Sequence, residues 1–598
     1  MKKTRYSVKT VCLLAMCGVA LFANAQEDKK KEQDLNRQMT LEREYDPSVQ
    51  DASKVNTLPQ VKEPEVRKIP IDYSDYTLAM DPAQQISVLP SGNIMTQMDY
   101  NKRRGYLRLG AGTYMNLNGD FGYHALSTAT DQLSIAFSHR SANGNVKYIQ
   151  LPDEKVKAKI NDNLGGLKYA HTFEKASLNV GLNYGYSAYN YYGLSMSPFS
   201  SLPMQDLLNV ADRETNQVNQ TIAATLGVES KEDADLAYLV DLGFVNFSRK
   251  YGISKDTDGP KETTIEAKVN VSKRFNGDMR FGLEALVEYF NYSLPAEKAL
   301  PNGGLYICEF ENHAEVALHP YYEVEGENWK VRLGANVMLK TGDESLFMAT
   351  PNVAANFEVA DKTELYIKAN GKLYSNSMYE MSKINRYLPA EELTPSRNWL
   401  DGVLGIKSGV APGFWFDIFA GYKMTSDDVL FVPGRTFEEG GFGNFSEAMS
   451  GINTKQLFVG ASLKYSYQQL FELTLKGQYN NWKAEYGDEW IGFSDSSLEH
   501  AWGKPEMELN AGVMVRPMDK LAVALDYSLA TGRYTLLAGA DLYKMNNINE
   551  LNLTATYTLN DTFGFYAKVN NLLSQKYELY YGYPMQRLSA QVGVNINF

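Results

Sequence analysis

Cysteine and histidine are scarce in this sequence. Its 598 residues include three cysteines and six histidines, and the apolar run near the N-terminus holds two of the cysteines, which leaves Cys308. A single thiol forms no disulfide framework, and no His/Cys group has the spacing of a metal site. His139 and His500 are expected near one rim of the fold as surface histidines, with no recognisable nucleophile beside them. The sequence therefore predicts no metal, no cofactor and no enzymatic activity.

Long apolar runs are also nearly absent. Only 11–25 qualifies; it follows four cations and ends in Ala23-Asn24-Ala25, the small-residue pattern of a cleavage site. We predict a secretory signal peptide over 1–25, cleaved near Ala25. The alternative of a lipoprotein would place the cut before Cys17, where Met16 is a poor neighbour. The mean hydropathy of −0.36 is not that of a bundle of membrane helices.

The charge balance is acidic. The whole chain has a net charge of −12, and removal of the cationic signal makes the remainder more acidic. An acidic exported protein is a poor match for nucleic acid, so no nucleic-acid partner is expected.

Residues 26–104 differ in composition from everything after them. A charge-rich stretch (26–46) is followed by a proline-dotted stretch (56–76), neither of which has a continuous apolar face. We predict an irregular leader, periplasmic or luminal, with one short helix near 30–45. Two interpretations stay open: a disordered leader, or a segment that becomes ordered by packing inside or against another structure.

From 105 to 598 the sequence alternates between apolar and polar residues in long runs. A clear example begins at residue 457, where every second side chain is apolar: Leu457, Val459, Ala461, Leu463, Tyr465 and Tyr467. A period of two places one set on each face of a β-sheet. These strands exceed the usual five or six residues and are long enough to cross a bilayer at a tilt.

Two kinds of connection alternate along this region. Tight turns such as 174–177, 276–279 and 560–562 alternate with longer loops, expected near 140–162, 193–215, 293–304, 376–397, 424–452, 483–504 and 532–546. This alternation is typical of outer-membrane barrels. The pattern predicts an all-β fold: a transmembrane antiparallel β-barrel of about 22 strands, closed because a spanning sheet can have no free edge.

The C-terminal residues carry a family resemblance. The stretch 565–598 resembles the C-terminus of TonB-dependent outer-membrane receptors through Val569-Asn570-Asn571-Leu572-Leu573, Lys576-Tyr577-Glu578, Tyr583-Pro584 and Arg587. The resemblance implies transport across the bacterial outer membrane and insertion by the barrel-assembly machinery. The final strand is similar to the signal which that machinery reads, and its implied residues are Gly593, Val594, Ile596 and Phe598.

The resemblance stops at the N-terminal side of the barrel. Residues 26–99 are too few for the plug domain of that family and contain neither its glycine-rich motifs nor a TonB box. The stretch TLEREYDPSVQDASKVNTLPQV (40–61) resembles plug-less members from Bacteroidetes-type bacteria, which puts TonB-driven import in doubt. Two functions follow: uptake across the outer membrane, or a structural or assembly subunit of a larger outer-membrane complex with periplasmic or surface lipoprotein partners.

A barrel of 22 strands has a backbone radius of roughly 22 Å, so its lumen needs a filling. The leader 26–99, inward-folded loops such as 424–452 or a separate partner could fill it, and the leader together with loops is the expected filling. Inward polar residues could line a substrate path, or pair with a plug or with one another; they are Glu472, Lys476, Asp526 and Lys568. Aromatic residues of one outer loop could contact a ligand or partner, or simply pack the loop; they are Trp490, Phe493 and Trp502.

Overall fold

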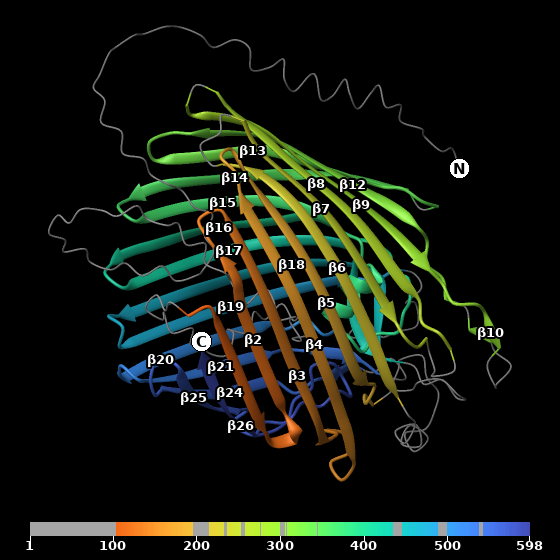
Figure 1. Cartoon of the computed structure of the whole chain (residues 1–598). Helices are drawn as coiled ribbons and strands as arrows, with labels where there is room; N and C mark the ends of the chain where they lie inside the picture. Colours follow the sequence, from red (N-terminus) through yellow and green to blue (C-terminus); the bar gives the residue numbers. More distant parts are fainter. Residues whose placement is uncertain are drawn as a thin grey trace, which may run out of the picture. The chain divides into compact units, whose positions relative to one another are not determined.

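The computed structural model describes residues 103–194, 215–231, 236–252, 257–275, 277–299, 305–306, 308–343, 345–434, 445–487, 499–537 and 542–598. The expected signal peptide and all but the last two residues of the expected leader lie outside this part of the chain. Within it the chain forms one 22-stranded antiparallel sheet, two small two-stranded sheets and little helix (Figure 1). The prediction of a β-barrel of about 22 strands is confirmed.

The first half of the wall follows chain order. Its strands are β1 (Gly105–Gly112), β2 (Leu117–Ser127), β3 (Asp131–Lys147), β4 (Lys155–Thr172), β5 (Ala176–Asn190), β6 (Asn216–Ser230), β7 (Leu236–Arg249), β8 (Lys261–Phe275), β9 (Met279–Ser293), β12 (His313–Glu325) and β13 (Trp329–Lys340). A 3₁₀ turn, η2 (Thr113–Met115), joins β1 to β2, and the pair β10 (Lys298–Ala299) and β11 (Leu305–Tyr306) lies between β9 and β12.

The second half continues in the same order. Its strands are β14 (Leu346–Ala360), β15 (Thr363–Tyr374), β16 (Ser396–Ala411), β17 (Phe414–Pro433), β18 (Ser446–Tyr467), β19 (Phe471–Glu485), β20 (Met507–Met518), β21 (Leu521–Thr531), β24 (Ile548–Thr558), β25 (Phe563–Asn570) and β26 (Ser589–Asn597). The helix α3 (Met378–Ile384) follows β15, and the pair β22 (Tyr534–Leu536) and β23 (Leu542–Lys544) follows β21.

The last strand pairs with the first, which closes the barrel. Leu109 lies opposite Val594, and Gly110 lies opposite Gly593, in the β1–β26 ladder. Gly105 and Phe598 complete that ladder by exchanging two backbone hydrogen bonds of 2.8 and 2.9 Å. Closure pairs the backbone groups that a free edge would leave unsatisfied in lipid.

The two ends of the barrel differ in their connections. Tight turns, for example 128–130, 361–362 and 412–413, join the strands at the end where Phe598 lies, which we call the inner end. The other end, which we call the outer end, carries most of the longer loops, including 375–395 and 571–588. Two loop predictions were too long, because β3, β4, β17 and β18 extend into 140–162 and 424–452.

Apolar side chains occupy the outward face of the strands. Val592, Leu404 and Leu457 are 66%, 60% and 56% exposed, and similar residues recur at every second position around the wall. An exposed aliphatic belt of this extent is what a hydrocarbon environment requires of a spanning barrel. No helix in the described ranges is long and apolar enough to span a membrane.

The wall is shortest at the seam where it closes. β25, β26 and β1 contain 8, 9 and 8 residues, against 20 and 22 in β17 and β18. On the inward face, Tyr566 lies over two glycines of the seam, since a Cβ on Gly593 would meet its ring at 2.3 Å and a Cβ on Gly110 would meet its hydroxyl oxygen at 2.0 Å. The guanidinium of Arg108 lies 4.1 Å from the centre of the same ring. Glycine is therefore required here by close packing.

Candidate functional site: a loop layer at the outer end

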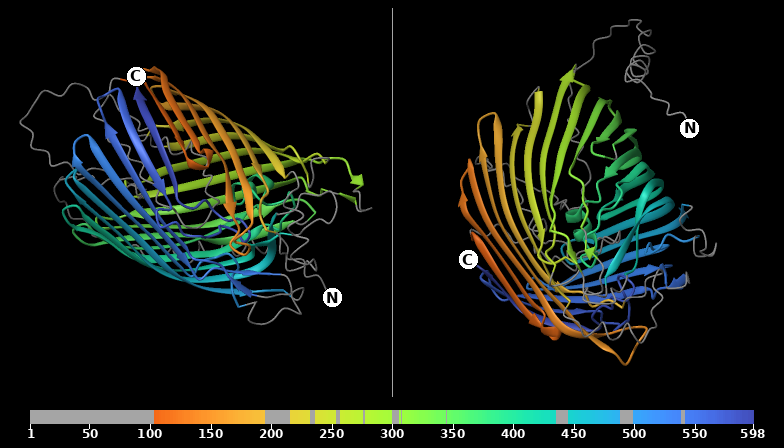
Figure 2. Two further views of the ribbon diagram at one scale, coloured as in Figure 1. Left: turned by 90° about the horizontal axis from the view of Figure 1, so that it is seen from below. Right: turned by 90° about the vertical axis from the view of Figure 1, so that its right-hand side faces the viewer.

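The loop 375–395 enters the barrel and is anchored to the inward face of β8. Ser377 caps α3, because its Oγ accepts from the backbone N–H of Glu380 at 3.3 Å. Ser377 Oγ also donates to Glu262 Oε1 at 2.9 Å, and the backbone N–H of Tyr379 donates to Glu262 Oε2 at 3.0 Å. Since Ile265 on the same strand is exposed outward, Glu262 faces the lumen. Figure 2 shows α3 within the ring of strands.

A buried ion pair holds the same loop to β4. Arg386 Nη1 donates to Asp162 Oδ2 at 3.1 Å, and both side chains are largely buried. Ser187 donates a further hydrogen bond to the Asp162 carboxylate. Arg249 on β7 contributes from a third strand by donating to the carbonyl of Leu388 at 2.9 Å. Buried charges are tolerated only when they are paired and hydrogen-bonded in this way.

Tyrosines from separate loops pack together over the lumen. The rings of Tyr387 and Tyr583 stack with centroids 4.0 Å apart, and Tyr192 meets Tyr583 edge to face at 5.0 Å. Tyr580 donates its hydroxyl to the carbonyl of Ile384 at 2.8 Å. Buried tyrosines contribute large apolar area and keep a polar group satisfied at the same time.

The outer ends of β17 and β18 join this packing. Leu430 packs with Trp502 and Leu536 in one buried cluster, and Phe431 meets Tyr580 edge to face at 5.4 Å. The backbone N–H of Ser446 donates to the carbonyl of Tyr387 at 3.0 Å. We call the packed segments the loop layer: 148–154, 191–194, 375–395, 430–434, 445–446, 499–506, 532–537 and 571–588.

A cavity of about 320 Å³ lies between the loop layer and the wall formed by β17 to β20. Its lining mixes aromatic, hydroxyl and charged side chains, including Trp482, Tyr580 and Lys423. The hydroxyl of Thr535, which also lines it, is buried and has no hydrogen-bond partner within the described part of the chain. Apolar surface with a few polar groups in an enclosed space is typical of small-molecule sites.

An ion pair and a buried arginine border this cavity. Lys504 Nζ lies 2.6 Å from Asp428 Oδ2, and Thr454 donates to the same oxygen at 2.6 Å. Arg533 Nη1 donates to the carbonyl of Glu578 at 2.8 Å. Burial lowers the pKa of Arg533 to about 10, so it stays charged at neutral pH.

Glu578 makes the loop layer sensitive to pH. Its buried carboxylate accepts from Gln150 Nε2 at 3.1 Å, and burial raises its pKa from 4.5 to about 7. Between pH 4.5 and 7 the Glu578 carboxyl is protonated in the packed layer but ionised in the unpacked loop. The stability of the layer is therefore highest below pH 4.5 and falls as the pH rises to 7. We expect slower amide exchange in 571–588 at pH 5 than at pH 8, after correction for intrinsic rates. Glu578→Gln should remove the difference, and an unchanged difference in that variant would exclude Glu578 as its source.

The predicted lumen residues lie on the inward face of β19, β21 and β25. Glu472 and Lys476 lie on β19, where Leu475 faces outward, and Lys464 Nζ is 3.6 Å from Glu472 Oε1. Asp526 on β21 and Lys568 on β25 are close enough to interact electrostatically. Their role as lining of a substrate path stays a prediction.

The predicted outer-loop aromatics divide between described and undescribed parts of the chain. Trp490 and Phe493 lie outside the described residues. Trp502 is 1% exposed; its ring packs against Tyr486 at 4.7 Å and borders the cavity. It reaches no external surface in this arrangement. Contact of the three aromatics with a ligand or partner, or their packing within the loop, stays a prediction.

The residues of the predicted assembly signal lie along β26 and at its end. Val594 and Ile596 face outward with Phe598, which is about half exposed and stacks loosely on Phe121 at 6.3 Å. Gly593 faces inward under Tyr566. Their recognition by an assembly machinery stays a prediction.

Asp162, Arg386 and the tyrosine packing were not predicted from the sequence. Asp162 fell in an expected loop, and the partners of these residues are far apart in the chain. One signal was present: 577–583 contains four tyrosines, and 189–192 contains three. Such density in a loop favours burial against other loops.

Metal chemistry receives no support from the described residues. Within those ranges no group of three or more His, Cys, Asp or Glu side chains is placed to hold a metal ion. His139 and His319 instead make hydrogen bonds to Asn163 and Asn336.

The fold and the loop layer define a closed spanning barrel whose outer mouth is covered by its own loops. No family model matches this chain, and no curated protein matches it. Solved structures do match in fold. The FrpB iron transporter from Neisseria meningitidis has a TM-score of 0.62 at 9% identity, with 83% of this chain and 82% of that chain covered.

Two further receptors match over the same share of this chain. The ferripyoverdine receptor of the outer membrane of Pseudomonas aeruginosa has a TM-score of 0.60 at 12% identity, with 83% of this chain and 72% of that chain covered. The ferric-catecholate import receptor Fiu from E. coli, in its closed form, has a TM-score of 0.59 at 10% identity, with 83% and 82% covered. At these identities the similarity establishes a shared fold.

Proposed function

We propose that this chain is an outer-membrane barrel protein that takes up a small ligand from the outer side, with the loop layer as its gate. The partly open cavity beneath the layer carries the proposal, because it combines aromatic surface with an unpartnered buried hydroxyl, that of Thr535. The shared fold adds support, since the neighbours are by name an iron transporter, a copper transporter and an import receptor.

The proposal also covers the export, membrane insertion and family of the chain, as the sequence resemblance implies. The chain is exported with 1–25 removed near Ala25, is inserted by the barrel-assembly machinery and contacts outer-membrane lipid. It belongs with the plug-less, TonB-receptor-like barrels of Bacteroidetes-type bacteria, and its loop layer takes the place of a plug. The role of the layer as a plug is supported by its contacts with the inward side chains of β4, β7 and β8. Uptake without a plug is expected not to require TonB.

Filling the cavity tests the proposal. Thr535→Trp places a large ring in a 320 Å³ space and should lower ligand entry at least tenfold, without loss of assembled barrel. The measurement is cellular uptake of radiolabelled ferric catecholate, ferripyoverdine and Cu²⁺ by the wild type, the deletion strain and the variant. Leu404→Trp, on the lipid-facing surface, is the matched control and should retain uptake.

Equal uptake of all three probes by the wild type and the deletion strain would reject this class of ligand for the barrel. It would favour the second candidate function, a structural or assembly subunit with lipoprotein partners. One observation favours that candidate: the loop layer closes the outer mouth, as a scaffold barrel also needs. Stoichiometric recovery of other envelope proteins in a native pull-down, together with unchanged uptake on deletion, would establish it.

A further inference from the structure

Glu508 places a buried carboxylate at the wall of the cavity under the loop layer. It lies on β20, where the preceding Met507 is 41% exposed on the outward face, so the side chain of Glu508 faces the lumen. Glu508 is 8% exposed, and none of the described residues gives its carboxylate a hydrogen bond or an ion pair. A buried ionised carboxylate is unfavourable unless a cation accompanies it.

The lysines that line the same cavity each have an acidic neighbour within the chain. Lys504 Nζ lies 2.6 Å from Asp428 Oδ2. Lys423 on β17 lies directly opposite Asp401 on β16, where cross-strand side chains of opposite charge attract each other. The positive charges of these two lysines are therefore offset without Glu508.

The remaining basic residues near Glu508 are also shared with other groups. Arg533 donates to the carbonyl of Glu578 at 2.8 Å, and the side chain of Glu578 attracts its charge as well. Lys476, on the strand next to β20, interacts electrostatically with both Glu508 and Asp417. In the described part of the chain, Glu508 is thus the acidic group of the cavity lining that lacks a paired cation.

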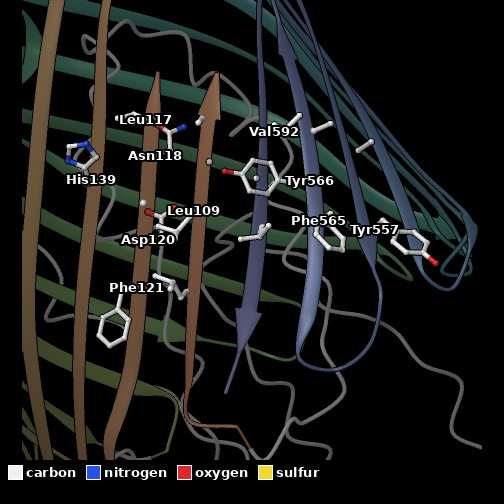
Figure 3. A pocket seen from close by; sticks show the side chains of 18 of the residues that line it. Leu109, Leu117, Asn118, Asp120, Phe121, His139, Tyr557, Phe565, Tyr566 and Val592 are labelled. Atoms are coloured by element: carbon white, nitrogen blue, oxygen red, sulfur yellow. The ribbon is translucent and has the colours of Figure 1, made fainter. Parts of the chain in front are cut away.

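Aromatic rings on the inward face of this barrel hold cations. The guanidinium of Arg332 lies 3.6 Å from the centre of the Tyr321 ring, and that of Arg108 lies 4.1 Å from the centre of the Tyr566 ring. Figure 3 shows the ring of Tyr566 crossing the seam with its hydroxyl directed toward β1. The face of an aromatic ring attracts positive charge, so such rings suit a cationic ligand.

Lys504 shows how the cavity itself holds an ammonium group. Its Nζ lies between the carboxylate of Asp428, at 2.6 Å, and the ring of Trp482, whose centre is 5.0 Å away. The hydroxyl of Thr454 donates to the same oxygen of Asp428 at 2.6 Å. A carboxylate, an aromatic ring and a hydroxyl together form this internal ammonium site.

The lining contains the same three kinds of group a second time, without an occupant from the chain. Glu508 supplies the carboxylate and Tyr580 supplies an aromatic ring. The hydroxyl of Thr535 is buried and has no hydrogen-bond partner among the described residues. An external ligand with a positive charge and a second polar group would satisfy both unpartnered groups.

We propose that the ligand of this cavity carries a cationic nitrogen group, an ammonium or a guanidinium, that pairs with Glu508. Its body packs against the aromatic lining, and a second polar group of the ligand bonds to the hydroxyl of Thr535. This inference rests on the proposed function, because it names the class of ligand which the same cavity takes. An anion of the same size is rejected, since its charge would face the carboxylate of Glu508.

Three probes of nearly equal shape separate charge from size. Tyramine, tyrosol and 4-hydroxyphenylacetate share a hydroxyphenyl ring on a short chain, which ends in an ammonium, a hydroxyl and a carboxylate respectively. Saturation-transfer NMR on the full chain in detergent at pH 8 measures the affinity for each probe. The unmodified chain should bind tyramine at least tenfold more tightly than either of the other two.

Variants at Glu508 assign the preference to its charge. Glu508→Gln keeps the size of the side chain and should lower tyramine affinity at least tenfold, with tyrosol affinity unchanged. Glu508→Lys should reverse the preference, so that 4-hydroxyphenylacetate binds more tightly than tyramine. Glu364→Gln, on the wall outside the cavity, is the matched control and should bind all three probes as the wild type does. The shift in gel mobility on heating confirms that each variant forms a folded barrel.

The outcomes separate this inference from the proposed function. It is overturned if the wild type does not bind tyramine, if it binds tyrosol or 4-hydroxyphenylacetate as tightly, or if Glu508→Gln binds tyramine as the wild type does. Selective tyramine binding with equal tyramine uptake by the wild type and the deletion strain would reject uptake and keep the ligand class. Uptake that Thr535→Trp blocks, without selective tyramine binding, would keep the function and reject the ligand class.

Discussion

Asp162→Ala will convert a closed barrel into a conducting one. Removing this carboxylate leaves the buried guanidinium of Arg386 without its ion-pair partner, at 3.1 Å in the native arrangement. Breaking a buried pair from one side costs about 3–5 kcal/mol, because an uncompensated charge remains in the interior. The loop 375–395 avoids that cost by leaving the lumen, while the wall keeps its backbone ladders.

Single-channel recording in planar bilayers measures the outcome. The wild type should be nearly silent, and Asp162→Ala should show large, steady openings in keeping with a lumen of roughly 22 Å backbone radius. Each protein is recorded with and without residues 26–104. The comparison shows whether the loop layer or the leader blocks the current. Glu364→Ala is the matched control, since it breaks the Lys407–Glu364 pair of 2.9 Å on the wall and away from the layer.

A double variant tests the physical reason. Asp162→Ala with Arg386→Met removes both charges and fills the space with an apolar chain, so it should restore much of the closed state. A silent Asp162→Ala barrel, even after deletion of 26–104, would falsify the assignment of the loop layer as the gate. Large conductance in the wild type would also contradict the claim that the layer blocks the lumen.

Val594→Arg will reduce the stability of the assembled barrel by about 2–4 kcal/mol, the cost of a cation near the middle of a lipid-facing wall. Val594 lies opposite Leu109 on one side and Phe565 on the other, both of them outward and about half exposed. Urea unfolding in lipid vesicles, followed by the shift in gel mobility between folded and unfolded barrel, measures the change.

Asn595→Arg is the control one residue away. Asn595 faces the lumen opposite Arg108 and Gly564, so the added cation meets water and one like charge instead of hydrocarbon. Its cost should be well below that of Val594→Arg and should shrink further with added salt, which screens the repulsion from Arg108. Equal costs for the two variants would mean that the facing of β26 is wrong.

The strands in the membrane could be predicted because lipid imposes a rule on every second residue. Leu457 to Tyr467 alternate with polar residues, and the structure places the strand, its facing and its turn at 468–470 as the sequence indicates. The hairpin at 128–130 was harder to predict, since the glycines and polar residues of β2 and β3 weaken the alternation.

Prediction failed where the strands leave the membrane. The stretches 140–162 and 424–452 were expected to be loops, yet β3, β4, β17 and β18 continue through much of them. Leu430 and Ile452 show the reason: their apolar side chains are buried in a cluster with Trp502 and Leu536, so an apolar residue here does not mark the lipid-facing side. The two-residue period disappears although the backbone pairing continues.

The sequence by itself determined a closed barrel of about 22 strands, the facing of its wall and the pairing of its last strand with its first. Each follows from a local rule, because hydrocarbon requires an apolar outward side chain at every second position and allows no unpaired edge. Only the tertiary structure decided that the outer mouth is covered, because that cover depends on pairs such as Asp162 and Arg386, which lie 224 residues apart. No periodicity links such residues, because one lies on β4 and the other in a loop, and they are neighbours only in the closed barrel.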